Sequence, residues 1–202
     1  MTRPIVIGLL GGVASGKSTV AAMLQELGAA CLDADKIGHE ALDDKKIRKQ
    51  VIDRFGEDIL DSRGRVDRKR LSERVFGQAQ ALKDLAGITH PWIGAKLRER
   101  LEALRSSGTY PAICLDVSLL LESGKYEDCV DTLVFIEADK ALRDQRAVTL
   151  RGWQPDEAGR REAHQMALDV KKTRADVVLT NNGDMNELKK QVQNFWNERI
   201  KG

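Results

Sequence analysis

The fold is decided by the stretch Gly11-Gly12-Val13-Ala14-Ser15-Gly16-Lys17-Ser18, which fits the phosphate-loop pattern G-x-x-x-x-G-K-[ST]. An apolar run of strand length, residues 5–10, precedes it, and a helical segment is expected to follow from Lys17 to about Leu27. Glycines let the backbone wrap closely around a phosphate, and the free N–H groups at a helix start attract the anion. The alternative, a glycine-rich turn that merely joins a strand to a helix, is disfavoured by the complete spacing.

Each residue type in this loop has a chemical task. Lys17 is expected to reach the β- and γ-phosphates of a nucleotide, and the Ser18 hydroxyl is expected to help hold Mg²⁺. The sequence therefore predicts nucleoside triphosphate binding. The expected nucleotide contacts in this loop are Gly12, Val13, Ala14, Ser15, Gly16, Lys17, Ser18 and Thr19.

Further apolar runs of strand length occur at residues 30–32, 112–117, 132–136 and 177–179, and longer segments with helical spacing separate them. This alternation predicts an α/β fold with a doubly wound parallel sheet flanked by helices. Two helical excursions interrupt the pattern, and no linker-like tract separates them from the rest. We therefore expect a single domain, 1–202, with its core at about 1–45, 110–138 and 174–202, and with helical excursions at about 46–109 and 139–173.

Composition excludes several classes of protein. The 202 residues carry 33 Lys and Arg against 31 Asp and Glu, so no domain-wide positive field favours nucleic acid. The basic stretch at residues 63–74 is interpreted as a solvated helix face. No apolar run approaches the roughly 20 residues of a membrane span, and the first residues show no cleavage-like site, so we expect a cytoplasmic protein without membrane contact.

The three cysteines, Cys31, Cys114 and Cys129, are unclustered in the sequence and lie beside apolar residues. We interpret them as buried reduced thiols rather than as disulfide partners or zinc ligands.

Acidic residues follow two of the expected strands. Asp33 and Asp35 come at the carboxyl edge of the sheet, where ligands of open α/β folds bind. An aspartate there can orient an acceptor hydroxyl and take its proton during phosphoryl transfer, although a helix N-cap is an equally good reading. Asp116 ends a later strand and is compatible with magnesium binding through water, with an acceptor contact, or with a turn or cap.

The second excursion is rich in basic residues and suggests a mobile cover that brings positive charge over phosphates and excludes water. At most two of these residues are expected to bind phosphate, and the others are expected to be solvated on exposed helices. The basic residues are Arg143, Arg146, Arg151, Arg160, Arg161, Lys171 and Lys172.

Taken together, these motifs resemble the dephospho-coenzyme A kinase family, which are P-loop kinases of the nucleoside-monophosphate-kinase type. The resemblance covers nearly the whole chain, from Ile7 to about Val192. The loop alone is shared by many NTPases, whereas the ordered set is much more specific. The set comprises residues 11–19, 32–40, 55–60, 64–68, 90–91 and 116–122, together with Gln165, Met166, Lys171, Ala175, Asp176 and residues 181–183.

The resemblance implies transfer of the ATP γ-phosphate, with Mg²⁺, to the ribose 3′-hydroxyl of dephospho-CoA, the last step of coenzyme A synthesis. It makes Asp35 the candidate base and Arg146 and Arg151 the nearest matches to the lid arginines, and it places Asn181 at the border of the adenine. The first excursion would receive dephospho-CoA, and the second would be the lid. The acceptor contacts implied in this way are Asp33, Asp35, His90, Asp116 and Leu119.

Three residues depart from the family pattern. Ser118 and Leu121 stand where the D-V-P-L-L-F-E motif has Pro and Phe, and Leu10 replaces the usual threonine before the loop. All three are expected beside the acceptor pocket or the loop, where they would alter substrate contacts or affinity.

Several alternatives stay open. One is a kinase for another nucleotide or small hydroxyl acceptor, and another is a nucleotide-dependent switch, against which the lack of an N-K-x-D-like segment counts. His39 and His90 are expected to be packed or capping histidines rather than acid–base catalysts. The sequence identifies no protein partner.

Overall fold

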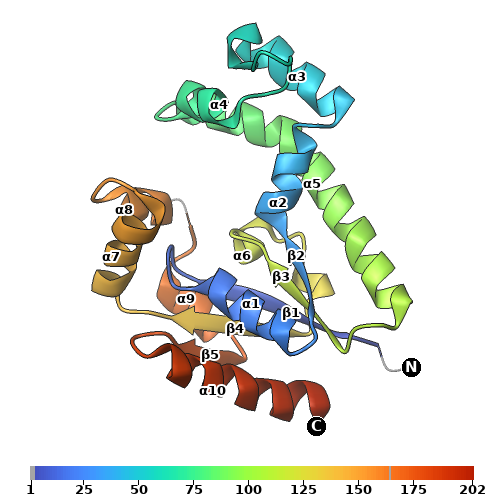
Figure 1. The fold of residues 1–202 in the computed structure, drawn as a ribbon, viewed down its shortest axis with the longest axis vertical. Helices are drawn as coiled ribbons and strands as arrows, with labels where there is room; N and C mark the ends of the chain where they lie inside the picture. Colours follow the sequence, from blue (N-terminus) through green and yellow to red (C-terminus); the bar gives the residue numbers. More distant parts are fainter. Residues whose placement is uncertain (1–2, 164) are drawn as a thin grey trace. The chain divides into compact units, whose positions relative to one another are not determined.

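The computed structural model describes residues 3–163 and 165–202 (Figure 1). Met1, Thr2 and His164 lie outside the described residues, although the expected domain of 1–202 and the expected lid of 139–173 include them. The described chain forms two compact units. Of the described residues, 3–32, 101–163 and 165–202 form the first unit, and Asp33–Arg100 is the second.

A five-stranded sheet forms the centre of the first unit, with the strand order β2-β3-β1-β4-β5. β1 pairs in parallel with β3 and β4, and β4 pairs in parallel with β5. The expected doubly wound parallel sheet is thus confirmed, and every strand lies where the apolar runs predicted it. The strands are β1 (Ile5–Gly11), β2 (Ala30–Asp33), β3 (Ala112–Asp116), β4 (Thr132–Glu137) and β5 (Val177–Thr180).

β1 is buried on both faces, as a central parallel strand requires. Ile7 and Leu9 belong to a cluster that includes residues of α1 (Lys17–Glu26) and α10 (Met185–Trp196). On the alternate positions, Gly8 leaves room for Leu120 of α6 (Leu120–Ser123), because a Cβ at Gly8 would lie 2.7 Å from the Leu120 side chain. Helices therefore cover both faces of this strand, and they hold the loop after β1 in a fixed position.

The second excursion is helical, as expected, and belongs to the first unit. It contains α7 (Lys140–Arg151), α8 (Glu157–Glu162) and α9 (Leu168–Thr173). Ala147 and Ala158 from α7 and α8 pack with Val13 of the phosphate loop in a small apolar cluster that Ala14 and Trp153 border. This segment therefore contacts the loop directly.

The second unit is entirely helical and has its own apolar core, in which Val51, Phe55 and Leu71 are buried. It begins at Asp33, earlier in the chain than the excursion expected at 46–109. Its elements are α2 (Ala34–Ala41), α3 (Lys45–Phe55), the 3-10 turn η1 (Glu57–Ile59), α4 (Arg68–Val75) and the larger part of α5 (Ala79–Ser107). The basic side chains of residues 63–74 are exposed, as expected.

The cysteines are reduced thiols, as expected. All three are free, with Cys114 and Cys129 buried and Cys31 partly buried. Cys31 and Cys114, although far apart in the sequence, are neighbours in space, since β2 and β3 are adjacent strands. The hydrogen bond with Cys31, together with burial, raises the pKa of the Cys114 thiol well above its ordinary value.

For the two histidines, expected to be packed or capping, the packed alternative was wrong. His39 and His90 are both exposed, on α2 and α5, so neither is packed in a core. Helical periodicity places both residues away from the apolar stripe of their helices. No helix among residues 3–163 and 165–202 has the length and apolar character needed to cross a membrane.

Candidate active site

The phosphate loop runs from the end of β1 to the first turn of α1, as the sequence predicted. Gly16, the N-cap residue of α1, has φ 100° and ψ 22°, a left-handed conformation that glycine adopts without strain. A Cβ on Gly16 would also collide with the side-chain amide of Asn181. Two independent constraints therefore require glycine here, one from the turn and one from a residue far along the chain.

Lys17 lies along the loop backbone. Its Nζ donates hydrogen bonds to the carbonyl oxygens of Gly11 and Gly12, both at 3.1 Å. Desolvation lowers the pKa of Lys17 to about 8, although the nearby carboxylate of Asp116 opposes this shift. Positive charge on Lys171 and Arg151 lowers the pKa further. Cationic side chains thus converge on the loop, as a phosphate site requires.

Ser18 and Asp116 meet at the carboxyl edge of the sheet. The Ser18 hydroxyl donates a hydrogen bond of 3.1 Å to Oδ2 of Asp116, the last residue of β3. A hydroxyl and a carboxylate side by side are hard oxygen ligands that suit Mg²⁺. No group of three or more His, Cys, Asp or Glu side chains in the described ranges could hold a metal. An ion at this pair would therefore complete its shell with water and phosphate oxygens, as Mg²⁺ commonly does.

Asn181 joins the loop to α7. Its side-chain Nδ2 donates a hydrogen bond of 2.7 Å to the backbone carbonyl of Ser15. Its backbone carbonyl accepts a hydrogen bond of 3.0 Å from Nη2 of Arg146. Nη1 of Arg146 is buried and has no hydrogen-bond partner among the described residues. A buried donor of this kind suits a polar ligand group. The adenine contact expected of Asn181 stays a prediction.

The basic residues of the second excursion divide by their partners. Four of them pair with carboxylates: Arg143 with Glu162, Arg161 with Glu157, Lys171 with Glu122, and Lys172 with Glu137. Arg143 and Lys171 are buried, so the expectation of solvated side chains was wrong for these two. Each is tolerated in the interior because a carboxylate from another helix or strand neutralises it.

Arg151 is exposed, and its guanidinium lies 5.0 Å from the ring centroid of Trp153. It also lies close enough to Lys17 to influence that residue's pKa. Arg146 and Arg151 are the two lid candidates named from the sequence. Neither belongs to the four ion pairs described above.

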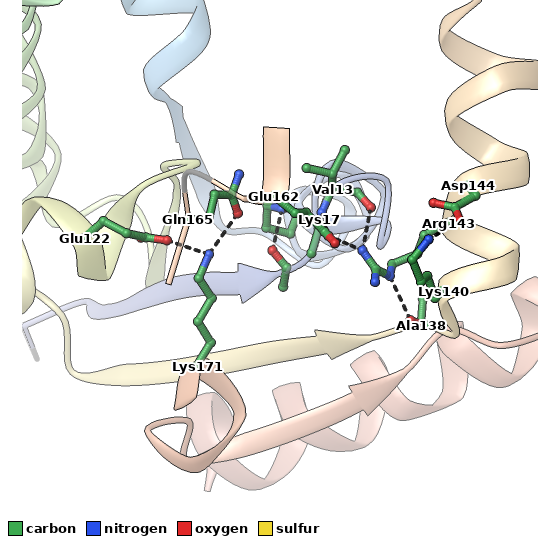
Figure 2. A network of polar contacts seen from close by, with 12 residues as sticks. Val13, Lys17, Glu122, Ala138, Lys140, Arg143, Asp144, Glu162, Gln165 and Lys171 are labelled. Carbon is green, nitrogen blue, oxygen red and sulfur yellow. Dashed lines mark hydrogen bonds and ion pairs between the residues drawn. The ribbon is translucent and has the colours of Figure 1, made fainter. Parts of the chain in front are cut away.

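A buried ion pair was missed by the sequence reasoning (Figure 2). Nζ of Lys171 lies 2.7 Å from Oε1 of Glu122 and 3.0 Å from Oε1 of Gln165, and the backbone N–H of Met166 donates to the same Glu122 oxygen. Desolvation raises the pKa of Glu122, but these hydrogen bonds outweigh it and hold the pKa below its ordinary value. The pair joins α6 to α9.

The second unit contains the acidic pair. Oδ1 of Asp33 accepts hydrogen bonds from the backbone N–H groups of Asp35 and Lys36, at 2.9 and 3.1 Å, and so caps α2. Of the two readings left open for this pair, the cap therefore holds for Asp33. The carboxylate of Asp35 is exposed, and no side chain of the unit Asp33–Arg100 pairs with it. Asp35 thus keeps a free carboxylate at the start of a fixed helix.

A second contact in this unit also escaped sequence analysis. The guanidinium of Arg100 binds both carboxylate oxygens of Glu40, at 2.9 and 2.5 Å, and so joins α5 to α2. Hydrogen bonds from Arg100 lower the pKa of Glu40. His90 lies on the same α5 and is exposed.

The remaining residues expected near the acceptor or the loop lie in different surroundings. Leu119 is 38% exposed and Ser118 is exposed, so both are accessible to a ligand. Leu10 and Leu121 are buried in the core. At these two departures from the family pattern the side chains are packed in the interior.

A parallel sheet whose first strand enters a G-x-x-x-x-G-K-S loop, with lysine, serine and aspartate gathered at its carboxyl edge, defines a P-loop kinase. The family model described as dephospho-CoA kinase matches residues 5–187. The chain therefore belongs to the dephospho-CoA kinase family.

Individual relatives agree with this assignment. The chain is 38% identical to a dephospho-CoA kinase of Geobacter sulfurreducens over 96% of its own length and 98% of that protein, and 39% identical to one of Carboxydothermus hydrogenoformans over 93% and 90%. Among solved structures, TT1252 from Thermus thermophilus matches with a TM-score of 0.77 and 31% identity, covering 98% and 99% of the two chains. The dephospho-CoA kinase from Campylobacter jejuni matches with a TM-score of 0.72 and 25% identity over the full length of both.

Proposed function

We propose that this chain transfers the γ-phosphoryl group of ATP to the 3′-hydroxyl of dephospho-CoA, giving coenzyme A and ADP. The observation that carries the proposal is the meeting of Lys17, Ser18 and Asp116 at the phosphate loop of a chain of this family. The proposal places the reaction in the cytoplasm, with ATP and dephospho-CoA as partners and without nucleic acid or membrane.

ATP is held by the loop. The backbone N–H groups from Gly12 to Thr19 surround the phosphates, and Lys17 turns from the carbonyls of Gly11 and Gly12 toward the β- and γ-oxygens. The unpartnered Nη1 of Arg146 is a donor for the nucleotide, and Arg151 brings positive charge toward the same end of the loop. Mg²⁺ bound at Ser18 and Asp116 would neutralise charge on the phosphates during transfer.

The acceptor is activated by Asp35. Its exposed carboxylate orients the 3′-hydroxyl and accepts the proton as the oxygen attacks the γ-phosphorus. Asp33 fixes the start of α2 and so the position of Asp35. We assign acceptor binding to the unit Asp33–Arg100 with His90, and to Asp116 and Leu119 of the first unit. The segment 139–173 acts as the lid.

The test is a coupled ADP-release assay with Mg·ATP and dephospho-CoA, with mass spectrometry to confirm a phosphorylated product and NMR to place the phosphate on the 3′-oxygen. We expect turnover that depends on the acceptor. Nucleoside monophosphates and CoA itself serve as matched acceptors that should not be phosphorylated. Turnover with a nucleoside monophosphate but not with dephospho-CoA would instead identify a kinase of another acceptor.

A further inference from the structure

One contact within the phosphate loop is not part of the reaction proposed above. The backbone N–H of Val13 donates a hydrogen bond of 2.8 Å to Oε1 of Glu162, the last residue of α8. The loop's N–H groups are the donors that bind phosphate oxygens. A carboxylate of the second excursion therefore occupies one of the loop's phosphate donors.

Arg143 completes the arrangement (Figure 2). Its Nη1 forms an ion pair with Oε1 of Glu162 and donates a hydrogen bond of 3.3 Å to the carbonyl of Val13, while its Nε donates one of 3.0 Å to the carbonyl of Ala138. The Arg143 side chain is only 6% exposed and that of Glu162 is 20% exposed. One ion pair thus holds both the N–H and the C=O of Val13.

Gly12 permits this close approach. A Cβ at Gly12 would collide with the guanidinium of Arg143 and the carboxylate of Glu162. The charge of Glu162 also reaches Lys17, whose pKa it raises. Glu162 therefore contacts a phosphate donor of the loop, pairs with a buried cation beside it and influences the catalytic lysine, which are three interactions that a bound phosphate would also make.

A γ- or β-phosphate and the Glu162 carboxylate cannot share this position, because each carries negative charge and each needs the same N–H donor. We propose that Glu162 stands in for a phosphate oxygen on the loop, and that ATP binding displaces it and transfers the Val13 N–H and the Arg143 guanidinium to the nucleotide. Glu162 is then a latch that closes α8 onto the loop. This inference rests on the ATP binding of the proposed function and does not depend on the identity of the acceptor.

The latch has a structural consequence for the lid. Val13, Ala147 and Ala158 pack together beside the ion pair, and Trp153 borders them. The guanidinium of Arg161 lies 4.0 Å from the centroid of the Trp153 ring. When Glu162 leaves the loop, the end of α8 must shift and the surroundings of Trp153 must change. Trp153 is therefore an internal reporter of the latch.

The decisive experiment is calorimetric titration of ATP into the wild-type protein and into Glu162→Gln, without any acceptor. The glutamine keeps the size and an acceptor oxygen but removes the competing charge, so we expect ATP to bind at least about fivefold more tightly. The matched control is Glu157→Gln on the same helix, which removes the same charge from a pair with Arg161, 2.7 Å long, that does not contact the loop. The control should leave the ATP dissociation constant within about twofold.

The titrations distinguish failure of the proposed function from failure of the latch. If the wild-type protein does not bind ATP, the proposed function fails. If it binds ATP, and folded Glu162→Gln binds equally or more weakly, Glu162 supports the loop and the latch is overturned. If the glutamine variant does not fold, Glu162→Asp shortens the contact and should also tighten ATP binding.

Two further measurements test other parts of the latch. Arg143→Lys should weaken ATP binding in the Glu162→Gln background by at least about fivefold, because no carboxylate at position 162 then competes with the phosphate for the guanidinium. In the wild-type protein, ATP should change the fluorescence of Trp153, and Trp153→Phe should abolish that change. An unaltered Trp153 signal at saturating ATP would contradict displacement of α8.

Discussion

The hydroxyl of Ser18 donates a hydrogen bond of 3.1 Å to the carboxylate of Asp116, across 98 positions of the chain. The contact forms because β3 lies beside β1 in a parallel sheet, so both strands end at the same edge. Ser18 arrives with the first turn of α1, directly after the loop. The loop alone can cradle phosphates, and this pair is the position that we propose for Mg²⁺.

Replacement of Asp116 by asparagine tests that position. Asparagine keeps the shape and an acceptor for Ser18 but loses the charge that favours a divalent cation. We expect turnover to fall by about 10² or more and the Mg²⁺ concentration for half-maximal activity to rise. A Mg²⁺ titration of the steady-state rate measures both the turnover and the half-maximal Mg²⁺ concentration. Asp144→Asn, which removes a carboxylate paired with Lys140 on α7, is the control and should leave both values unchanged.

The pH dependence of ATP binding tests Lys17. Its pKa of about 8 in the free protein is lowered by desolvation, and phosphate oxygens will raise it because they stabilise the ammonium form. ATP binding near pH 8 should therefore take up about half a proton, and affinity should fall as the pH rises above 8. Calorimetry in buffers of different ionisation enthalpy measures the uptake. In Lys17→Arg the cation does not titrate, so the uptake should vanish, whereas a flat wild-type affinity above pH 8 would contradict the assignment.

Asp35→Asn tests the proposed base. The amide cannot accept the proton of the 3′-hydroxyl, so we expect turnover to fall by about 10² or more while the ATP dissociation constant stays within about twofold. Steady-state rates with dephospho-CoA and calorimetry with ATP give the two values. Near-normal turnover would show that Asp35 is not the base.

Asp33→Ala is compared with Asp35→Asn in a measurement of stability. It removes the cap of α2, whose two hydrogen bonds measure 2.9 and 3.1 Å, and should lower the free energy of unfolding by about 1 kcal/mol. Urea denaturation measures this loss. Asp35→Asn, in contrast, should not alter stability to the same degree, because its carboxylate pairs with no side chain of its unit.

Removal of only one member of the Lys171–Glu122 pair should destabilise the first unit strongly. Lys171→Met leaves the Glu122 carboxylate desolvated without its cation, and we expect a loss of about 3–5 kcal/mol in the free energy of unfolding. The double variant Lys171→Met with Glu122→Gln removes both charges and should recover most of the loss. Urea denaturation of the three proteins forms the test, and equal stability of the single and double variants would mean that the pair is not coupled.

Local patterns made much of the fold predictable. The apolar runs gave the five strands within about a residue, because burial on both faces of a parallel strand leaves a continuous hydrophobic stretch. The loop and the start of α1 were equally clear, because glycine spacing and the Lys-Ser pair are adjacent in sequence.

The errors came from side chains whose partners lie far away in sequence. Arg143 and Lys171 looked like solvated residues of exposed helices, since periodicity gives a helix's apolar face but not the carboxylate that a long cationic side chain will reach. The proximity of Cys31 and Cys114 was not predicted, because strand order does not follow chain order. His39 and His90 were expected to be packed or capping, and the packed alternative was wrong for both, because a single polar residue carries no periodicity of its own to place it.

By itself, the sequence determined that the chain has a phosphate loop at the end of its first strand, a parallel α/β core and two helical excursions. Each of these features depends on residues that are close to one another in the sequence. Only the tertiary structure decided that Ser18 meets Asp116, that Asn181 supports the turn at Gly16, and that Glu162 occupies the N–H of Val13. These contacts depend on strand order and on how helices return to the sheet. The path of the chain in space therefore assembles the site around a loop that the sequence already specified.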